Sequence, residues 1–163
     1  MRLLRRVVVV LLSVLVAGAC NEQQRATYPT FADAERAKAA ERGWIPQYVP
    51  RSATEIAEVH DLDVNTQRLR FRAPLADLRS MVAALRPVQT SEVREHDDRV
   101  PELKGPWPNE LRTLGQKAVR DRPELGLFFA ADEEGARCVA VEWKARVAYA
   151  WSCDLRGSAP HRE

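Results

Sequence analysis

The sequence predicts an α+β fold: a single small domain in which about three helices accompany an antiparallel sheet with a C-terminal three-strand meander. Two observations favour this class. The helical patterns are separate from a terminal run of hairpin patterns, which is typical of α+β domains rather than of a parallel α/β sheet. Three apolar runs close the chain, LGLFFAA, RCVAVEW and RVAYAWSC, and short turns such as Asp132–Gly135 join them.

Residues 1–19 have the order of a secretory signal peptide and precede this domain. Three arginines come before the apolar run Val7–Ala17, and the small residues Gly18 and Ala19 follow it. The run is shorter than the roughly 20 residues that a membrane-spanning helix needs. We therefore predict export and cleavage rather than a permanent span.

The cleavage region predicts a lipid anchor on Cys20. Residues 16–20, VAGAC, resemble the lipobox of bacterial lipoproteins, in which the cysteine receives a diacylglycerol. Two or three acyl chains give stable anchorage, since each buried methylene contributes about 0.8 kcal/mol. This predicts a lipid-anchored protein on the periplasmic side of the bacterial cell envelope. Asn21 favours the outer membrane over the inner. A secretory signal cut elsewhere and an uncleaved anchor are the alternatives.

Beyond the signal we expect a lipidated cysteine with a polar tether over residues 20–28, a globular domain over 29–156 and a flexible tail over 157–163. The mature chain has 22 Lys and Arg (25 less the three signal arginines) against 23 Asp and Glu, a net charge near −1. Basic and acidic residues alternate along it rather than cluster. Nucleic acid is therefore not an expected partner, since its binding needs a clustered positive face.

The first half of the domain contains two helix patterns and a strand pair. Helix formers and a capping-box sequence predict a helix over residues 31–42, which Gly43 ends. A proline-rich loop follows. The alternation in RLRFR predicts a strand over residues 68–72 with Leu69 and Phe71 inward, paired with residues 56–62. A second helix should run from Pro74 to Pro87, which stops it.

The middle of the chain is less regular. We expect one strand over residues 88–93, then a loop with three prolines, and a short third helix beginning at Pro108.

Cys138 and Cys153 remain after Cys20 is lipidated, and in an oxidising compartment they are expected to form a disulfide. Folding the last two apolar runs about Ala145 and Arg146 would set the two cysteines opposite each other. Two buried free thiols are the alternative.

The sequence carries no recognisable catalytic motif, and we predict neither catalytic residues nor a cofactor. It has no GxSxG, GxGxxG, P-loop, HExxH or CxxC. The weak candidates for a divalent metal site are His60, Asp61, Asp63 and His96, which folding would have to bring together. A strand end and a solvated charge run explain the same residues without a metal. A pair of carboxylates for glycoside cleavage could also be drawn from the acids of this chain, but with 23 Asp and Glu residues such a pair is expected by chance.

Five aromatic residues in or beside loops and hairpins are candidates for contact with a partner: Trp44, Tyr48, Trp107, Tyr149 and Trp151. Such amphipathic rings are frequent in binding surfaces. Core packing is the alternative explanation for each of them.

Residues 42–72 carry a resemblance. The segments Gly43–Pro46, Pro50–Ala53 with Ile56, His60–Asp63 and Phe71–Arg72 are similar to a pattern in small bacterial lipoproteins and exported proteins. The resemblance implies an envelope location and supplies no catalytic residue.

The function expected from the whole sequence is that of a non-enzymatic lipoprotein domain. It is tethered to the membrane through lipid and binds an envelope protein or a cell-wall component. An inhibitor or immunity-type lipoprotein and a small metal-dependent envelope hydrolase are the alternatives.

Overall fold

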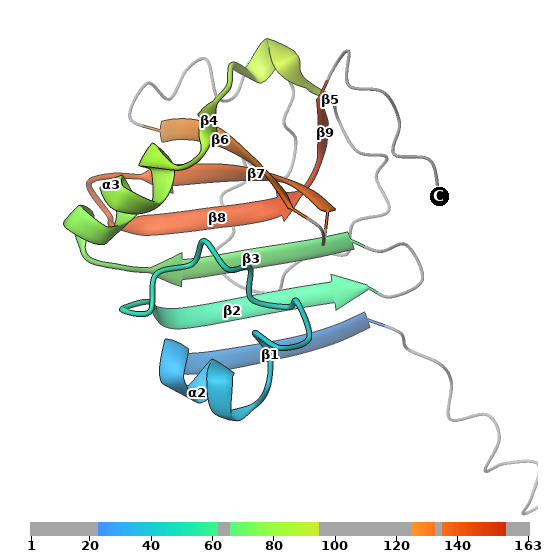
Figure 1. The fold of residues 1–163 in the computed structure, drawn as a ribbon, viewed down its shortest axis with the longest axis vertical. Coiled ribbons are helices and arrows are strands. Elements are labelled where there is room, and N and C mark those ends of the chain that lie inside the picture. Colours follow the sequence, from blue (N-terminus) through green and yellow to red (C-terminus); the bar gives the residue numbers. More distant parts are fainter. Residues whose placement is uncertain (1–22, 62–65, 95–124, 133–134, 156–163) are drawn as a thin grey trace, which may run out of the picture.

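A computed structural model describes residues 23–61, 66–94, 125–132 and 135–155 (Figure 1). Its main feature is a seven-stranded sheet in the order β1-β2-β3-β8-β7-β6-β4, in which every neighbouring pair is antiparallel. The strands are β1 (Gln23–Thr30), β2 (Thr54–Asp61), β3 (Thr66–Arg72), β4 (Arg86–Pro87), β6 (Leu125–Asp132), β7 (Gly135–Glu142) and β8 (Val147–Ser152). Strands β5 (Val93–Arg94) and β9 (Asp154–Leu155) form a separate two-stranded sheet.

The predicted fold class was wrong. The described residues form mostly antiparallel sheet with two short α-helices, α2 (Phe31–Arg36) and α3 (Leu75–Ala83), rather than about three helices beside a meander. The last three long strands are not a separate unit, because β8 pairs with β3 and joins them to the N-terminal strands. The third helix expected near Pro108 lies outside the described residues. Joining of the N-terminal and C-terminal strands into one sheet is a tertiary event that no local pattern reveals.

The segment predicted as a polar tether contributes the edge strand of the sheet. Residues 23–28 belong to β1, which pairs antiparallel with β2 from Gln23 opposite Asp61 to Thr30 opposite Thr54. An edge strand is held by backbone hydrogen bonds on one side only and needs no apolar alternation. The polar composition of this segment therefore concealed the strand.

The first predicted helix is shorter than expected, because a local motif ends it at Arg36. The amide of Ala39 donates to the carbonyl of Ala34, and the amide of Lys38 donates to the carbonyl of Glu35. Lys38 has a φ of 60°, so the arrangement is a Schellman motif with lysine at the left-handed position where glycine is usual. The helix formers after Arg36 therefore lie in turns.

The second predicted helix is confirmed as α3, although it ends at Ala83. The strand expected over residues 88–93 is instead divided. Short strands β4 and β5 flank a 3₁₀ turn, η1 (Thr90–Glu92).

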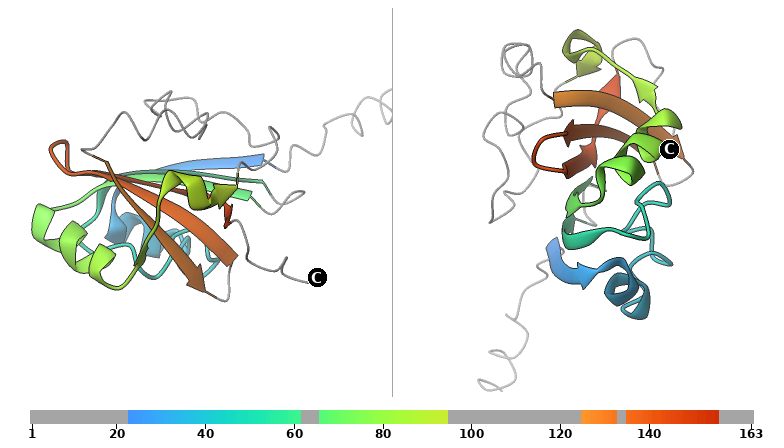
Figure 2. Two further views of the ribbon diagram at one scale, coloured as in Figure 1. Left: turned by 90° about the horizontal axis from the view of Figure 1, so that it is seen from above. Right: turned by 90° about the vertical axis from the view of Figure 1, so that its left-hand side faces the viewer.

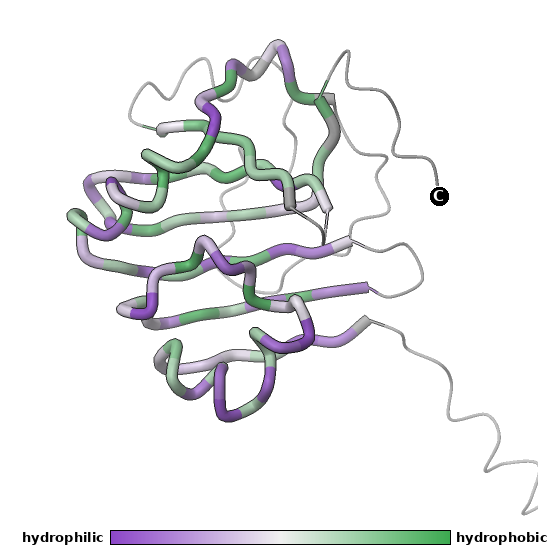
Figure 3. Tube along the Cα trace, viewed as in Figure 1, coloured by the Kyte–Doolittle hydropathy of each residue, from purple (hydrophilic) through white to green (hydrophobic). Residues whose placement is uncertain are grey.

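Two apolar cores lie on opposite faces of the sheet, as the alternation of side chains requires. In β7, Val139 and Val141 belong to one core while Cys138 and Ala140 belong to the other. Helices α2 and α3 and the loop between α2 and β2 cover the first face (Figure 2). Leu69 and Phe71 are buried in this core, so the inward face predicted for β3 is confirmed. Apolar character is concentrated in β6, β7 and β8, whereas β1 is hydrophilic (Figure 3).

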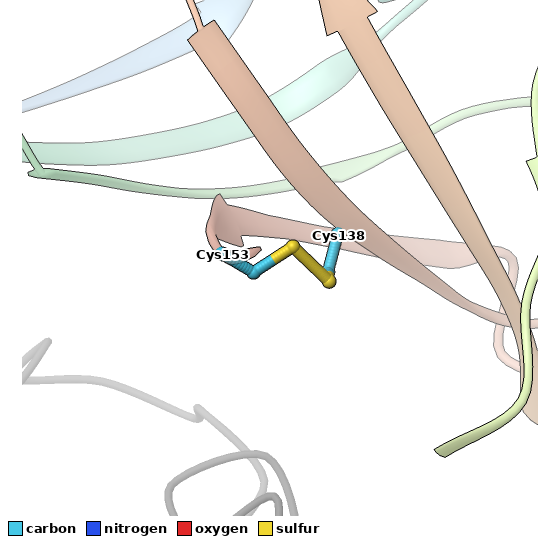
Figure 4. The surroundings of a disulfide bond; sticks show 2 residues. All are labelled: Cys138 and Cys153. Carbon is cyan, nitrogen blue, oxygen red and sulfur yellow. A yellow bond between two sulfur atoms is a disulfide. The ribbon is translucent and has the colours of Figure 1, made fainter. Parts of the chain in front are cut away.

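Cys138 and Cys153 form a disulfide, with 5.7 Å between their Cα atoms (Figure 4). The predicted register of this hairpin was wrong by two residues. Cys138 is paired with Trp151, and Cys153 follows β8 with its amide donating to the carbonyl of Ala136. Because the side-chain period of a strand is two residues, Cys153 still lies on the face of Cys138. The disulfide therefore joins diagonal rather than directly opposite positions.

Candidate functional site

The candidate site is a group of buried polar side chains on the helix-covered face of the sheet. Strand β2 places Ile56, Glu58 and His60 on this face by alternation, and Ile56 belongs to its apolar core. In the register with β3, Glu58 lies opposite Leu69 and His60 lies opposite Gln67. Glu58 is 1% exposed and His60 is 5% exposed, which is unusual for both residue types.

Glu58 and His60 are joined by a hydrogen bond of 2.8 Å between Glu58 Oε2 and His60 Nδ1. With the carboxylate ionised and the imidazole neutral, the proton of this bond is on Nδ1, and Nε2 is then a hydrogen-bond acceptor. Among the described residues, neither His60 Nε2 nor Glu58 Oε1 has a hydrogen-bond partner, although both atoms are buried. The two side chains can therefore share a proton inside the protein.

Trp44 lies directly on His60. The two rings are stacked with 4.1 Å between their centroids and an angle of 23° between their planes. The Arg42 guanidinium lies on the indole as well, 4.7 Å from the ring centroid, which is cation–π geometry. A half-buried tryptophan thus connects an exposed cation to the buried pair.

Gln67 links this tryptophan to strands β7 and β8 on the same face of the sheet. Its side-chain amide donates to the backbone carbonyl of Trp44. Its side-chain carbonyl accepts a hydrogen bond of 2.9 Å from Arg137 Nε on β7, and its backbone amide donates to Ser152 Oγ on β8 at 2.9 Å. The loop that carries Trp44 is therefore fastened to β3 by a polar contact as well as by ring stacking.

Burial raises the pKa of the Glu58 carboxyl, and the hydrogen bond with His60 offsets part of this effect. Burial also raises the pKa of Tyr28 on β1, with a further increase from the charge of Glu58 and a decrease from Arg42. A carboxyl whose pKa is higher in the folded state adds stability that is fully present below its unfolded pKa. That stability is lost as the pH rises through the folded pKa. Glu58 therefore favours the fold least when it is ionised.

A groove lies on the same face of the sheet, between the loop before β2 and helix α3. It has a volume of about 450 Å³, and its lining includes Gln47, Tyr48, Arg51, Asp77, Met81 and Ala84. Ser52 Oγ donates to the Asp77 carboxylate and so connects the two walls. The groove has both apolar and charged lining, as a binding surface requires.

The structure divides the predicted aromatic set. Tyr149 and Trp151 are 5% and 7% exposed and belong to the core on the second face. Trp44 and Tyr48 are half-buried against the first core, and Tyr48 lines the groove. Trp107 lies outside the described residues. Trp44 and Tyr48 therefore remain as described candidates for partner contact.

The metal candidates are not brought together by the described structure. His60 lies on the helix-covered face of β2, and the adjacent Asp61 points to the opposite face by alternation. Asp63 and His96 lie outside the described residues. Within residues 23–61, 66–94, 125–132 and 135–155, no three His, Cys, Asp or Glu side chains are grouped for metal binding. The same ranges contain no helix with the length and apolar character needed to cross a membrane.

Sequence reasoning missed Glu58, Gln67 and Arg137. A signal for Glu58 was present, because Ile56 and His60 flank it at intervals of two and alternation puts all three on one face. Gln67 and Arg137 gave no such signal, because they meet only through the pairing of β3 with β8 and of β8 with β7.

Comparison with known proteins gives one match. A family model described as the YbbD head domain matches residues 22–72, or 51 of the 163 residues. No curated protein and no solved structure matches the chain. The matched segment contains Trp44, Glu58, His60 and Gln67 together with the residues that carry the lipoprotein resemblance, whereas Arg137 lies outside it. The chain is thus similar to a YbbD head domain over the part that builds most of the candidate site.

Proposed function

We propose that this protein is a bacterial envelope lipoprotein, anchored through lipid on Cys20, whose globular domain binds an envelope protein or a cell-wall component without catalysing a reaction. The signal-peptide pattern and the lipobox-like residues support the anchor. The buried disulfide is compatible with an oxidising compartment, and the match to a YbbD head domain supports an envelope-related role.

The groove between residues 47–52 and α3 is the observation that carries the binding role. It adjoins the loop that displays Trp44, and aromatic and arginine side chains on such a surface are typical anchors for a partner. The proposed binding face therefore consists of residues 37–53 and the groove-lining residues of α3. Both lie on the helix-covered side of the sheet.

The lipid anchor predicts incorporation of labelled palmitate into the protein in its native host. Replacement of Cys20 by serine should abolish the label, because only a thiol forms the thioether to diacylglycerol. Mass analysis of the wild-type protein should show a chain that begins at residue 20. Absence of label from the wild type, with the signal residues still attached, would contradict the anchor.

The binding face predicts site-dependent crosslinking in living cells. A photo-crosslinking residue at Gln47 or Ala84, both exposed and in the groove, should yield one or a few specific adducts. Ala131 is exposed on the opposite face of the sheet, and the same probe there should not yield them. Mass spectrometry then distinguishes a protein partner from cell-wall glycan. Equal adducts from both faces, or none from the groove, would reject this binding face.

A further inference from the structure

The buried pair Glu58 and His60 behaves as one acid–base unit, because the two side chains share a hydrogen bond of 2.8 Å. An ionised Glu58 beside a neutral His60 gives the pair a charge of −1. One added proton brings the net charge to zero, and a second brings it to +1. The side chains of Glu58 and His60 are 0% and 6% exposed, so desolvation disfavours both charged states of the pair. The pair therefore favours a single bound proton.

The pair also contacts the proposed binding face and helps to hold it on the sheet. The imidazole stacks on the indole of Trp44 with 4.1 Å between the ring centroids, and the Gln67 side-chain amide donates to the backbone carbonyl of Trp44. When the pair carries its proton, its net charge is zero, and the share of that proton on the imidazole adds a cation–π attraction to the indole. When the proton is lost, that attraction is lost too, and an uncompensated negative charge remains buried next to the imidazole.

We propose that Glu58 and His60 form a proton-operated latch: uptake of one proton by the pair strengthens the closure of residues 37–53 over the sheet, and its loss weakens that closure. The latch is a property of the folded domain alone. Its consequence, a binding face that depends on pH, rests on the proposed function.

The other charged and titratable groups described around the pair do not account for a closure that depends on pH. Tyr28 on β1 has a raised pKa and stays neutral across the pH range concerned. Arg42, in the covering loop, is positive throughout, so it opposes proton uptake by the pair but does not itself change charge. Arg137 on β7 is likewise always positive and contacts Gln67. None of these three groups therefore changes its charge when the pair gains or loses its proton.

Hydrogen exchange of backbone amides within residues 37–53 reports how firmly this segment is held. The amides of Trp44 and Ile45 donate to the carbonyl of Ala39 at 2.9 and 3.3 Å, and the amide of Val49 donates to that of Pro46 at 3.0 Å. Their protection factors in the purified full chain, measured by NMR and corrected for intrinsic exchange, should fall between pH 5 and pH 8. The fall should be about tenfold for each unit by which the pKa of the pair is higher with the loop closed than open.

Two variants and a matched control make the test specific. Glu58→Gln keeps an acceptor for His60 Nδ1 but cannot ionise, and should abolish the fall in protection. His60→Gln keeps a donor for Glu58 but removes the imidazole, and should shift the midpoint of the fall toward acid. Glu55→Gln, on the same strand with a side chain 58% exposed, should behave as the wild type.

Flat protection factors in the wild type would overturn the latch. So would a fall that survives Glu58→Gln, or one that keeps its midpoint in His60→Gln. These outcomes are independent of the partner, because crosslinking from Gln47 in cells can fail while the latch operates in the purified protein.

Discussion

Replacing Cys138 and Cys153 together by alanine is expected to lower the free energy of unfolding by about 2–5 kcal/mol. The disulfide closes a loop with a sequence separation of 15 residues, and its loss gives the unfolded chain more conformational freedom. Both cysteines are also buried in the second core, at 0% and 3% exposure, so the variant loses packing as well. Denaturant unfolding followed by circular dichroism measures the difference.

Two comparisons separate the contribution of the covalent bond to stability from the contribution of side-chain packing. Wild-type protein reduced under denaturing conditions and refolded with reductant keeps both sulfur atoms, so its loss of stability reports the bond alone. The double alanine variant should be less stable still, by the contribution of two buried thiols. If the oxidised wild type and the double variant unfolded at the same denaturant concentration, the disulfide would have no stabilising role in this fold.

The strand pairs that were predictable are those formed by neighbouring segments. Strict alternation in RLRFR fixed the inward face of β3, and the short connection between β7 and β8 indicated their hairpin. The register of that hairpin was not predictable, because its turn uses residues 143–146 with Arg146 at a φ of 57° rather than a glycine. Turn chemistry of this kind leaves no residue pattern to read.

The pairing of strands that are distant in the sequence could not be predicted. The pairing of β3 with β8 brings Gln67 beside Ser152, 85 residues later, and so creates the polar contacts of the candidate site. Local propensity could not reveal that β1 is a strand, since backbone pairing with β2 determines it. The lysine at position 38 ends α2 where the sequence pointed to Gly43, because a Schellman motif needs a backbone conformation rather than a particular residue. The candidate site therefore became visible only when the sheet was assembled.

His60→Ala should destabilise the protein by about 3–5 kcal/mol near neutral pH, because it leaves the Glu58 carboxylate buried without its hydrogen-bond donor. The cost should shrink as the pH is lowered, since burial raises the pKa of Glu58 and a proton removes the stranded charge. This follows the sign of the linkage: an acid with a raised folded pKa stabilises the fold below its unfolded pKa and loses that contribution as the pH rises. Chemical denaturation at several pH values between 4 and 8 measures the effect.

The double variant Glu58→Gln, His60→Ala isolates the charge from the other consequences of losing the imidazole. Both His60 variants lose the stacking contact with Trp44 and leave the same cavity, so these terms cancel in the comparison. Only the single variant retains the ionisable Glu58 carboxyl without the donor that His60 supplied. The double variant should therefore be the more stable of the two at pH 7, and its free energy of unfolding should depend little on pH. Equal destabilisation of the two at every pH would mean that the Glu58 charge has no energetic role. The cost of losing His60 would then lie in packing alone, and the pair could not act as a proton-binding unit.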